Sequence, residues 1–570
     1  MSSLSTARLL VFFSTLFGGL VVLKTAPTYA GWLLLPMAAF VALVMAHTNA
    51  RRLGARAQLA CTFYEGAMAR RGKDWAGQGH DGLDFVDAEH PYARDLDLFG
   101  KGSLFELLCT ARTALGQSTL ARWLAEPASA RDARSRQDAV VELAAQTDRR
   151  EELALLDPEG EGALNAEALC RWASQKPVEI SNFQRVAAVA LALYSVFALI
   201  AWELLGHGIA HLGLAAILCV LQDLLLAQRF KAVGSGAKLA DAGLPLLAGL
   251  LKSLEEHPAA CQTLTTLKEE VCTPLGPPSS SVDRLRKLVG GLRNAELNPF
   301  FGPVSFLIRY RVHRLRSIES WRQLAGPSIP HWIAAAGEYE ALIALGTYAY
   351  EHPDDVMPEI VDGPAQLHGQ GLAHPLLPAG SAVVNDVTLD TDHALLLISG
   401  SNMSGKSTFL RSIGSAVVLA MAGAPVRAAS LTLTPLALGA SIQIVDSLLS
   451  GESHFYAEIR RLATINELAK SEPHTLFLLD EILHGTNSSD RLAGAGAVIT
   501  DLVNRGALGL VTTHDLSLTA IADKLGQRAE NVHFEDSLID GRMVFDYRMR
   551  PGVVTKGNAL ELMRSLGLDV

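Results

Sequence analysis

The stretch LLLISGSNMSGKSTFLRSIG, residues 395–414, constrains the fold of this chain more than any other. An apolar run leads into a loop of small residues, and a pattern typical of a helix follows. The spacing Gly400-x-x-x-x-Gly405-Lys406-Ser407 is that of a phosphate-binding loop, in which backbone N–H groups and the positive end of a helix face an anion. Because such a loop connects a strand to a helix, the C-terminal part is predicted to be an α/β domain.

Two later apolar runs end in polar residues that suit the same chemistry. The segment TLFLLDE ends in Asp480 and Glu481, and the segment LGLVTTH ends in His514. In a nucleotide site Lys406 would bridge the β- and γ-phosphates, Ser407 and Asp480 would hold Mg²⁺, and Glu481 would polarise the attacking water. His514 suits a sensor of the terminal phosphate. Taken alone, the acidic pair could be a helix N-cap and the histidine could be structural, but together the motifs predict an ATPase with ATP and Mg²⁺ as its ligands.

Four apolar runs lie outside this domain, and hydrophobic residues make up 49% of the chain. They cover roughly residues 9–23, 28–46, 185–205 and 209–227. A membrane-spanning helix needs about 20 apolar residues, so four transmembrane helices in two hairpins are predicted, with the lipid bilayer as partner. The first run is also short enough for a signal peptide, and the fourth, which carries Asp223, could instead be a buried helix.

Charge placement orients these runs. Arginines and a lysine follow the second run between residues 51 and 73, and Arg229 and Lys231 follow the fourth. The positive-inside rule then predicts a multi-pass protein of the cell (inner) membrane whose termini, polar segments and ATPase domain are cytoplasmic. The six cysteines are scattered without a C-x-x-C pair, which is typical of reduced cytosolic thiols.

A net charge of −10 excludes a globally basic surface for nucleic acid, so any contact with DNA needs a local patch. The segment 284–322 contains nine Arg and Lys residues and is the candidate. It could face phosphate, nucleic acid or lipid. A solvated helix face that pairs with acidic residues is the simpler interpretation.

The chain is therefore expected to have five parts. They are an N-terminal transmembrane hairpin (1–50), a cytoplasmic helical region (51–184), a second transmembrane hairpin (185–230), a helical, lever-like region (231–355) and the ATPase domain (356–570).

The motifs occur in the order found in ABC-type ATPases, with SGESHFYAEI at residues 450–459 between the phosphate loop and the acidic pair. SGSNMSGKSTFLR, SGESHFYAEI, LLDEILHGTNSSD and TTHD closely resemble the MutS family of mismatch-repair ATPases, whereas an LSGGQ-type transporter signature is absent. LDLFGKGSLFELLCTARTALGQSTLARWLAEP, residues 96–127, is similar to the start of the MutS core. The resemblance implies an ABC-type P-loop ATPase domain preceded by an all-α, MutS-core-like region.

The resemblance also implies a homodimer that sandwiches two ATP molecules between its ATPase domains. Ser453 would reach the partner's γ-phosphate, and Ser488, Ser489 and Asp490 match the loop that communicates across the dimer, with Asp490 acting in trans. Glu481, His514 and Lys406 are the expected catalytic residues. The residues expected to bind nucleotide in the loop are Gly400, Ser401, Asn402, Met403, Ser404, Gly405, Lys406, Ser407 and Thr408.

The chain departs from the family in three ways. A membrane hairpin stands where the mismatch-reading domain would lie, and the interval 231–350 is short for long levers with a DNA clamp. No aromatic residue stands near Ala382 to Val384, where the family's adenine-stacking residue would fall, so phosphate and Mg²⁺ contacts are expected to carry the affinity.

Two functions follow from this pattern. The first is a membrane-anchored MutS-like ATPase coupled to binding of mismatched or branched DNA. The alternative is a membrane mechanochemical or regulatory ATPase without any nucleic-acid role. An ABC transporter half is disfavoured, because the apolar runs carry almost no polar residues for a substrate pathway.

Overall fold

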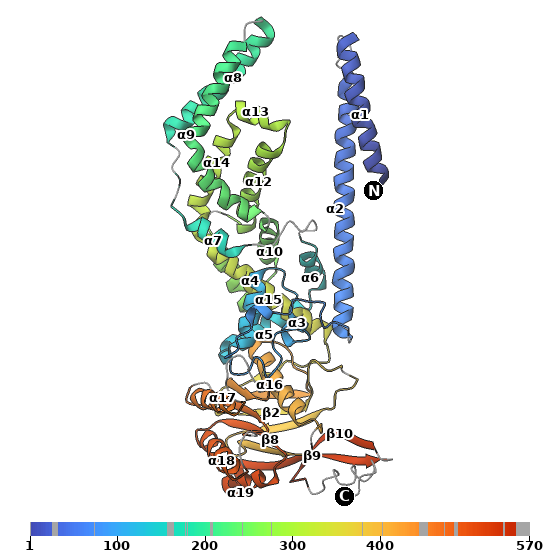
Figure 1. The fold of residues 1–570 in the computed structure, drawn as a ribbon, viewed down its shortest axis with the longest axis vertical. Coiled ribbons are helices and arrows are strands. Elements are labelled where there is room, and N and C mark those ends of the chain that lie inside the picture. Colours follow the sequence, from blue (N-terminus) through green and yellow to red (C-terminus); the bar gives the residue numbers. More distant parts are fainter. Residues whose placement is uncertain are drawn as a thin grey trace.

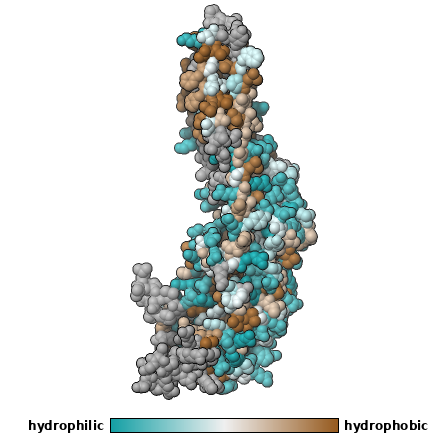
Figure 2. Space-filling model, turned by 90° about the vertical axis from the view of Figure 1, so that its right-hand side faces the viewer, coloured by the Kyte–Doolittle hydropathy of each residue, from teal (hydrophilic) through white to brown (hydrophobic). Residues whose placement is uncertain are grey.

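The computed structural model describes residues 2–25, 32–72, 74–156, 165–176, 178, 181–205, 209–241, 243–274, 276–378, 380–401, 403–443, 454–471, 474–483, 488–539 and 542–554. Helical arms form one end of the elongated molecule, and the β-sheets form the other (Figure 1). Figure 2 shows hydrophobic residues gathered on the upper part, above a lower part with many hydrophilic residues.

The first arm consists of α1 (Ser2–Thr25) and α2 (Leu34–Arg71). α2 has 38 residues and none of them is buried. The predicted boundary at residue 50 falls inside this helix, because the following segment contains many good helix formers and no proline. At its far end Arg70 donates two hydrogen bonds to Glu351, at 2.7 and 2.6 Å.

The second arm is the pair α8 (Asn182–Leu205) and α9 (Ile209–Asp241). By length and composition, three helices among the described residues can cross a membrane, with their apolar segments in 34–71, 182–202 and 209–231. The first predicted run lies in α1, but its apolar stretch, Leu9–Gly19, is shorter than a span. The fourth run, which could have been a buried helix, is only 17% buried.

A helical core lies between the arms and the sheets. Its long central helix is α15 (Ile329–Glu351), which packs against α4, α5, α10 and α11. Most of its residues are buried, which explains its even distribution of apolar side chains. The other helices of this part are α3 (Leu104–Leu108), α4 (Ala114–Ala125), α5 (Ala130–Ala144), α6 (Thr147–Ala154), α7 (Ala166–Ser174), α10 (Leu244–Glu256), α11 (Gln262–Val271), α12 (Pro278–Leu297), α13 (Phe301–Leu307) and α14 (Tyr310–Ala325).

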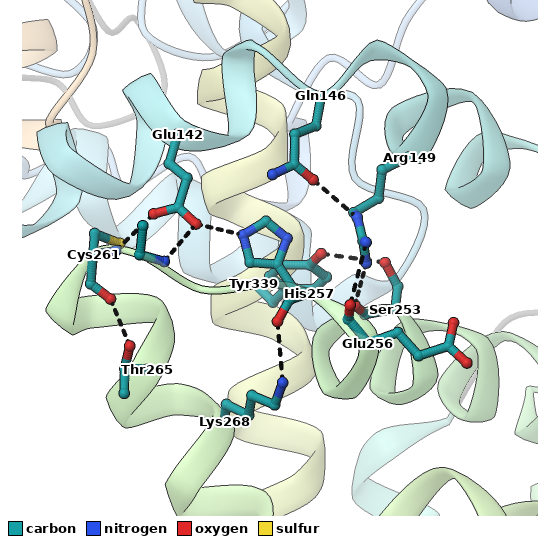
Figure 3. A network of polar contacts seen from close by, with 11 residues as sticks. Glu142, Gln146, Arg149, Ser253, Glu256, His257, Cys261, Thr265, Lys268 and Tyr339 are labelled. Carbon is teal, nitrogen blue, oxygen red and sulfur yellow. Dashed lines mark hydrogen bonds and ion pairs between the residues drawn. The ribbon is translucent and has the colours of Figure 1, made fainter.

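A polar network joins α5 to the α10–α11 connection (Figure 3). Glu142 accepts hydrogen bonds from the backbone N–H groups of Ala260 and Cys261 at 3.0 and 2.7 Å, and it contacts His257 Nε2 at 2.7 Å. Burial lowers the pKa of His257 although Glu142 opposes this effect, so the imidazole is neutral at pH 7. Lys268 donates to the His257 carbonyl oxygen at 3.0 Å. The network fixes the chain across α5, α10 and α11 without a buried cation.

The C-terminal part contains two sheets. The larger has the order β10-β9-β4-β8-β7-β6, and all its neighbouring strands are parallel except β9 and β10. Its strands are β4 (Leu395–Ser399), β6 (Leu436–Ser441), β7 (His474–Asp480), β8 (Leu508–Thr513), β9 (Ala529–Ile539) and β10 (Arg542–Pro551). The smaller sheet has the order β1-β5-β2-β3 and consists of β1 (Glu359–Ile360), β2 (Leu367–Leu372), β3 (Asn385–Leu389) and β5 (Ser430–Leu433).

Four helices accompany the larger sheet, namely α16 (Lys406–Ala422), α17 (His454–Leu468), α18 (Ser488–Asn504) and α19 (Ala520–Leu525). The predicted helical region followed by an α/β domain is therefore confirmed. The helical core packs directly on α16: a Cβ on Gly414 would come within 2.6 Å of Leu96 and 2.9 Å of Leu478. Buried Asp95 accepts backbone hydrogen bonds from Ile442 and Gln443 at 2.6 and 2.8 Å, just after β6.

Candidate active site

Three parallel strands bring the predicted chemical groups to one edge of the larger sheet. Ser399 at the end of β4 is in register with Thr513 of β8, and Asp480 at the end of β7 is in register with Thr512. The carboxyl ends of parallel strands share an edge, which is where open α/β sheets bind ligands. The phosphate loop and the acidic pair therefore lie next to each other although 80 residues separate Gly400 from Asp480.

The loop after β4 has a backbone that favours small residues. Gly400 has φ +153° and Gly405 has φ +102°, and a Cβ on Gly400 would lie only 2.8 Å from the Phe534 carbonyl oxygen. Met403 also has a positive φ, +68°, and its side chain is 84% exposed. Strained backbone of this kind concentrates at ligand sites. Lys406 then begins α16, so the positive end of this helix faces the loop.

Lys406 is a buried cation with incomplete charge neutralisation. Its Nζ donates hydrogen bonds to the carbonyl oxygens of Gly400 and Ser401 at 3.0 and 2.8 Å, but its distance to Glu481 Oε1 is 3.8 Å. Only 4% of the side chain is exposed. Burial lowers the pKa of Lys406, while the negative charges of Glu481 and Asp480 oppose the shift. A bound polyphosphate would favour the charged ammonium.

The acidic pair is held by β8. Thr512 Oγ1 donates to Asp480 Oδ1, and the backbone N–H of Glu481 donates to the Thr512 carbonyl oxygen at 3.2 Å. Glu481 adopts φ +49°, which turns its side chain away from the strand direction. His514 Nδ1 lies 3.4 Å from Glu481 Oε1. Glu481 thus has the phosphate-loop lysine on one side and the predicted sensor histidine on the other.

A cavity of about 720 Å³ lies beside these groups. Its lining includes Lys406, Ser407, Thr408, Asp480 and Glu481. A phosphate-rich ligand fits the neighbouring loop, because the Ser401 and Ser404 hydroxyl groups are buried there without a hydrogen-bond partner among the described residues. The site therefore combines a cation, free hydroxyl donors and two carboxylates.

Mg²⁺ also fits this set. Ser407 and Asp480 line the same cavity and offer oxygen ligands, and a phosphate would supply the remaining oxygens. Within the described ranges no group of three or more His, Cys, Asp or Glu residues could hold a metal by itself. A cation between Ser407 and Asp480 would therefore take further oxygen ligands from a bound phosphate.

Two aromatic residues of this cavity were not predicted from the sequence. Tyr547 from β10 and Phe534 from β9 line it, together with Val383. A Cβ on Gly405 would lie 3.0 Å from the Tyr547 ring, so the ring abuts the phosphate loop. Asn385 fixes this strand by donating to the Tyr547 carbonyl oxygen at 3.0 Å and accepting from the Met549 N–H at 2.8 Å.

The expectation that no aromatic residue near 382–384 stacks on the base stays a prediction, and Tyr547 lines the cavity from another strand. That expectation considered only the segment that leads into the phosphate loop. The register between β9 and β10 shifts between Phe545 and Met549, and Tyr547 has φ +56°. This irregularity directs the backbone toward the cavity, and hydrophobic periodicity carries no signal for it.

The remaining predicted residues are placed only in part. Asn402 and Ser453 lie outside the described residues, so their predicted roles stay predictions. Ser488 and Ser489 begin α18, and Asp490 follows in its first turn with an exposed side chain. The next residue, Arg491, pairs with Asp515 at 3.3 Å, which connects the start of α18 to the segment that carries His514.

Residues 396–569 match the family model described as MutS domain V. The chain is 37% identical over 245 residues to the DNA mismatch repair protein MutS 2 of Halobacterium salinarum, which covers 41% of this chain and 27% of the relative. It is 38% identical over 206 residues to the DNA mismatch repair protein MutS of Shouchella clausii, covering 35% and 23%.

The chain thus spans about a quarter of the length of these curated relatives. The matched region contains the phosphate loop, the acidic pair and His514. Through residues 396–569 the chain resembles domain V of MutS proteins, and these matches support its relationship to the MutS family.

Proposed function

We propose that this chain is a membrane-anchored, MutS-like ATPase that binds and hydrolyses Mg-ATP at the edge of the larger sheet. The observation that carries the proposal is the convergence of Lys406, Asp480 and Glu481 on one cavity beside a strained, glycine-containing loop. The similarity to MutS domain V over residues 396–569 also supports ATPase activity.

Each side chain has a role that its surroundings favour. Lys406 neutralises the phosphates, and the unpartnered Ser401 and Ser404 hydroxyl groups lie where the loop would meet them. Glu481 accepts a hydrogen bond from the attacking water. His514 lies 3.4 Å from Glu481 and either orients this carboxylate or contacts the terminal phosphate. Mg²⁺ held by Ser407 and Asp480 would neutralise charge that develops on the phosphates.

The homodimer forms part of the same proposal. In ABC-type sandwiches each nucleotide needs groups from the partner, and Ser453 and Asp490 are the residues of this chain that match them. The exposure of Asp490 at the start of α18 agrees with contact across a dimer. ATP binding would then bring two ATPase domains together and shift the helical cores that rest on α16.

Membrane anchoring rests on the three apolar helices and on the basic residues that follow them. The ATPase domain lies at the end of the molecule opposite α8 and α9, as a cytoplasmic domain below a membrane would (Figure 1).

Two processes could be coupled to ATP hydrolysis: DNA binding and movement of the membrane helices. The names of the relatives favour DNA, and the segment 284–322 was the predicted contact surface. At least five of its nine cations are paired within the chain, however. They are Arg286 and Lys287 with Asp283, Arg309 with Asp223, Arg311 with Glu296 and Arg322 with Glu319. This neutralisation favours the alternative, in which ATP-driven dimerisation performs work on the membrane helices.

The first test is ATP hydrolysis by the full chain in nanodiscs. Lys406→Ala should lower kcat/KM at least about 100-fold, or about 2.7 kcal/mol, because the main phosphate cation is lost. Lys252→Ala is the matched control, since this lysine is 61% exposed on α10. Unchanged turnover of the Lys406 variant would refute the assigned site.

Binding to matched, mismatched and branched duplexes, measured across a salt series, distinguishes an ATPase coupled to DNA from one that acts only on the membrane helices. A DNA-coupled ATPase should bind with steep salt dependence and respond to Mg-ATP. The membrane alternative requires no binding even at low salt while ATP hydrolysis persists.

A further inference from the structure

An exposed apolar surface caps the α12–α14 hairpin. We call residues 297–308, which join α12 to α14 through α13, the tip. Leu297 is 75% exposed and Phe300 is 84% exposed, and Val304 and Ile308 are exposed beside them. Large apolar side chains that gather at one exposed turn mark a surface that another apolar phase covers.

The tip lies beside the second membrane arm. α13 packs against both α8 and α9, at the upper end of the α12–α14 hairpin (Figure 1). Below it, Val312 forms a small buried cluster with Ala188 of α8 and Leu226 of α9. The α12–α14 hairpin therefore packs against both helices of the arm, α8 and α9.

An ion pair sets the depth of the tip along α9. Arg309 is 2% exposed and pairs with Asp223 at 2.5 Å, and its Nε donates to Gln222 at 2.8 Å. Asp223 lies eight residues before Lys231, the end of the apolar segment. Eight helical residues correspond to about 12 Å, which is within one leaflet of a bilayer with a hydrocarbon core of about 30 Å.

Basic and aromatic groups lie just below the tip. The Arg311 guanidinium lies 5.1 Å from the Phe230 ring centre and pairs with Glu296 at 3.2 Å. The Arg314 guanidinium lies 4.7 Å from the Tyr310 ring centre. Arginine and tyrosine below an apolar tip match the headgroup level of an anionic leaflet.

We propose that the tip inserts into the cytoplasmic lipid leaflet beside α9, as a third point of membrane attachment. The inference rests on the proposed membrane anchoring, because α9 defines the depth. A nucleic acid fits this surface poorly, since its exposed side chains are apolar and nearby Arg309 and Arg311 are already paired. The Arg309–Asp223 pair, next to the tip, holds the hairpin and α9 in one position.

Spin labels on the full chain in vesicles of phosphatidylethanolamine and phosphatidylglycerol test this proposal. Cys61 and Cys272, both exposed, are first replaced by serine. Single cysteines are then introduced by Phe300→Cys in the tip, Leu225→Cys on α9 and Leu324→Cys near the far end of α14. All three native side chains are more than half exposed, so the substitutions preserve packing.

Collision with oxygen and with a water-soluble nickel chelate is measured for each label. We expect loss of nickel-chelate broadening at positions 300 and 225 and its retention at 324. Nickel access at 300 with protection at 225 would overturn insertion of the tip while membrane anchoring stands. Nickel access at both positions would refute the anchoring itself.

Two other occupants give their own signals. Spin–spin broadening between labels at 300 would show that a second copy covers the tip, and this result would overturn the lipid assignment. Protection at 300 that appears only when duplex DNA is added would also overturn it.

Discussion

Two buried cations at opposite ends of the molecule are treated in different ways. Lys406, in the α/β domain, is 4% exposed and lies 3.8 Å from the Glu481 carboxylate. Arg309, beside the α8–α9 arm, is 2% exposed and has a carboxylate at 2.5 Å and an amide oxygen at 2.8 Å. Burial is nearly equal, but neutralisation is not.

The surroundings explain the difference. Lys406 borders a cavity with unpartnered hydroxyl groups nearby, so its environment is completed by an anion that enters from solution. Arg309 is enclosed by α9 and the α12–α14 hairpin, and its charge is compensated within the chain. A buried cation of the first kind indicates a ligand site, and one of the second kind indicates a structural joint.

Removing the carboxylate beside Lys406 should have the largest effect. Glu481→Gln should lower ATP hydrolysis about 10²- to 10⁴-fold, because general-base assistance is lost while the phosphate contacts remain. ATP should then accumulate on the protein and hold the dimer together. Single-turnover kinetics and light scattering with Mg-ATP measure both effects. A variant that hydrolyses normally, or stays monomeric with ATP bound, would contradict the assigned role or the sandwich.

Breaking the Arg309 pair should change stability and leave nucleotide binding intact. Asp223→Asn leaves a buried guanidinium without its counter-ion, which typically costs about 3–5 kcal/mol. Thermal unfolding in nanodiscs and the ATP Kd are the measurements. Asp283→Asn is the matched control, since its partners Arg286 and Lys287 are exposed and the expected loss is below about 1 kcal/mol. Weakened ATP binding in the Asp223 variant would contradict a purely structural role for Arg309.

His374 extends the comparison to a buried base in the cavity that contains Lys406. Burial, assisted by the charges of Arg411 and Arg427, lowers the pKa of His374 from 6.5 to about 4. The folded state therefore keeps a neutral imidazole, whereas the unfolded chain takes up a proton as pH falls through 6.5. Protonation of His374 in the unfolded chain does not affect the free energy of unfolding above pH 6.5. Between pH 6.5 and 4 this protonation should lower the free energy of unfolding by up to about 3 kcal/mol.

Unfolding of the wild type and of His374→Gln at several pH values measures this linkage. The variant should have a shallower loss of stability over the same pH interval. Equal slopes for both proteins would show that His374 does not govern the acid response.

Tyr547 tests whether the cavity beside Lys406 is a nucleobase site. Tyr547→Ala should raise the ATP Kd about 10-fold, because stacking of a base on an aromatic ring contributes about 1–3 kcal/mol. Tyr547→Phe retains the ring and should bind like the wild type. The affinity for tripolyphosphate, which has no base, should stay constant in all three proteins. A parallel loss for tripolyphosphate would mean that the ring supports the phosphate loop instead.

The α/β domain could be predicted from the sequence better than the arms, for physical reasons. The run 395–398 is apolar throughout because β4 is covered on both faces, and a loop with glycines follows it. Asp480 and Glu481 could be located because a buried strand has to end before they appear. At these positions the local sequence pattern, an apolar strand followed by polar residues, directly reflects the place of the residues in the fold.

Tyr547 and Asp223 had no such signal. Tyr547 reaches the cavity through a register shift between β9 and β10, and alternation along a strand does not encode such a shift. Asp223 looked like a reason to doubt the fourth apolar run, but its partner Arg309 lies 86 residues away and could not be paired with it from spacing. The charges of segment 284–322 were likewise visible, while their neutralisation depended on tertiary contacts.

The continuity of α2 has a mechanical consequence. At 1.5 Å per residue its 38 residues make a rod about 57 Å long, with a bidentate arginine–carboxylate clamp to α15 at one end. A rotation of only about 5° at Arg70 would displace the other end by about 5 Å, roughly one helical turn. Small rearrangements at the base of this rod are thus amplified into displacements on the scale of a lipid headgroup.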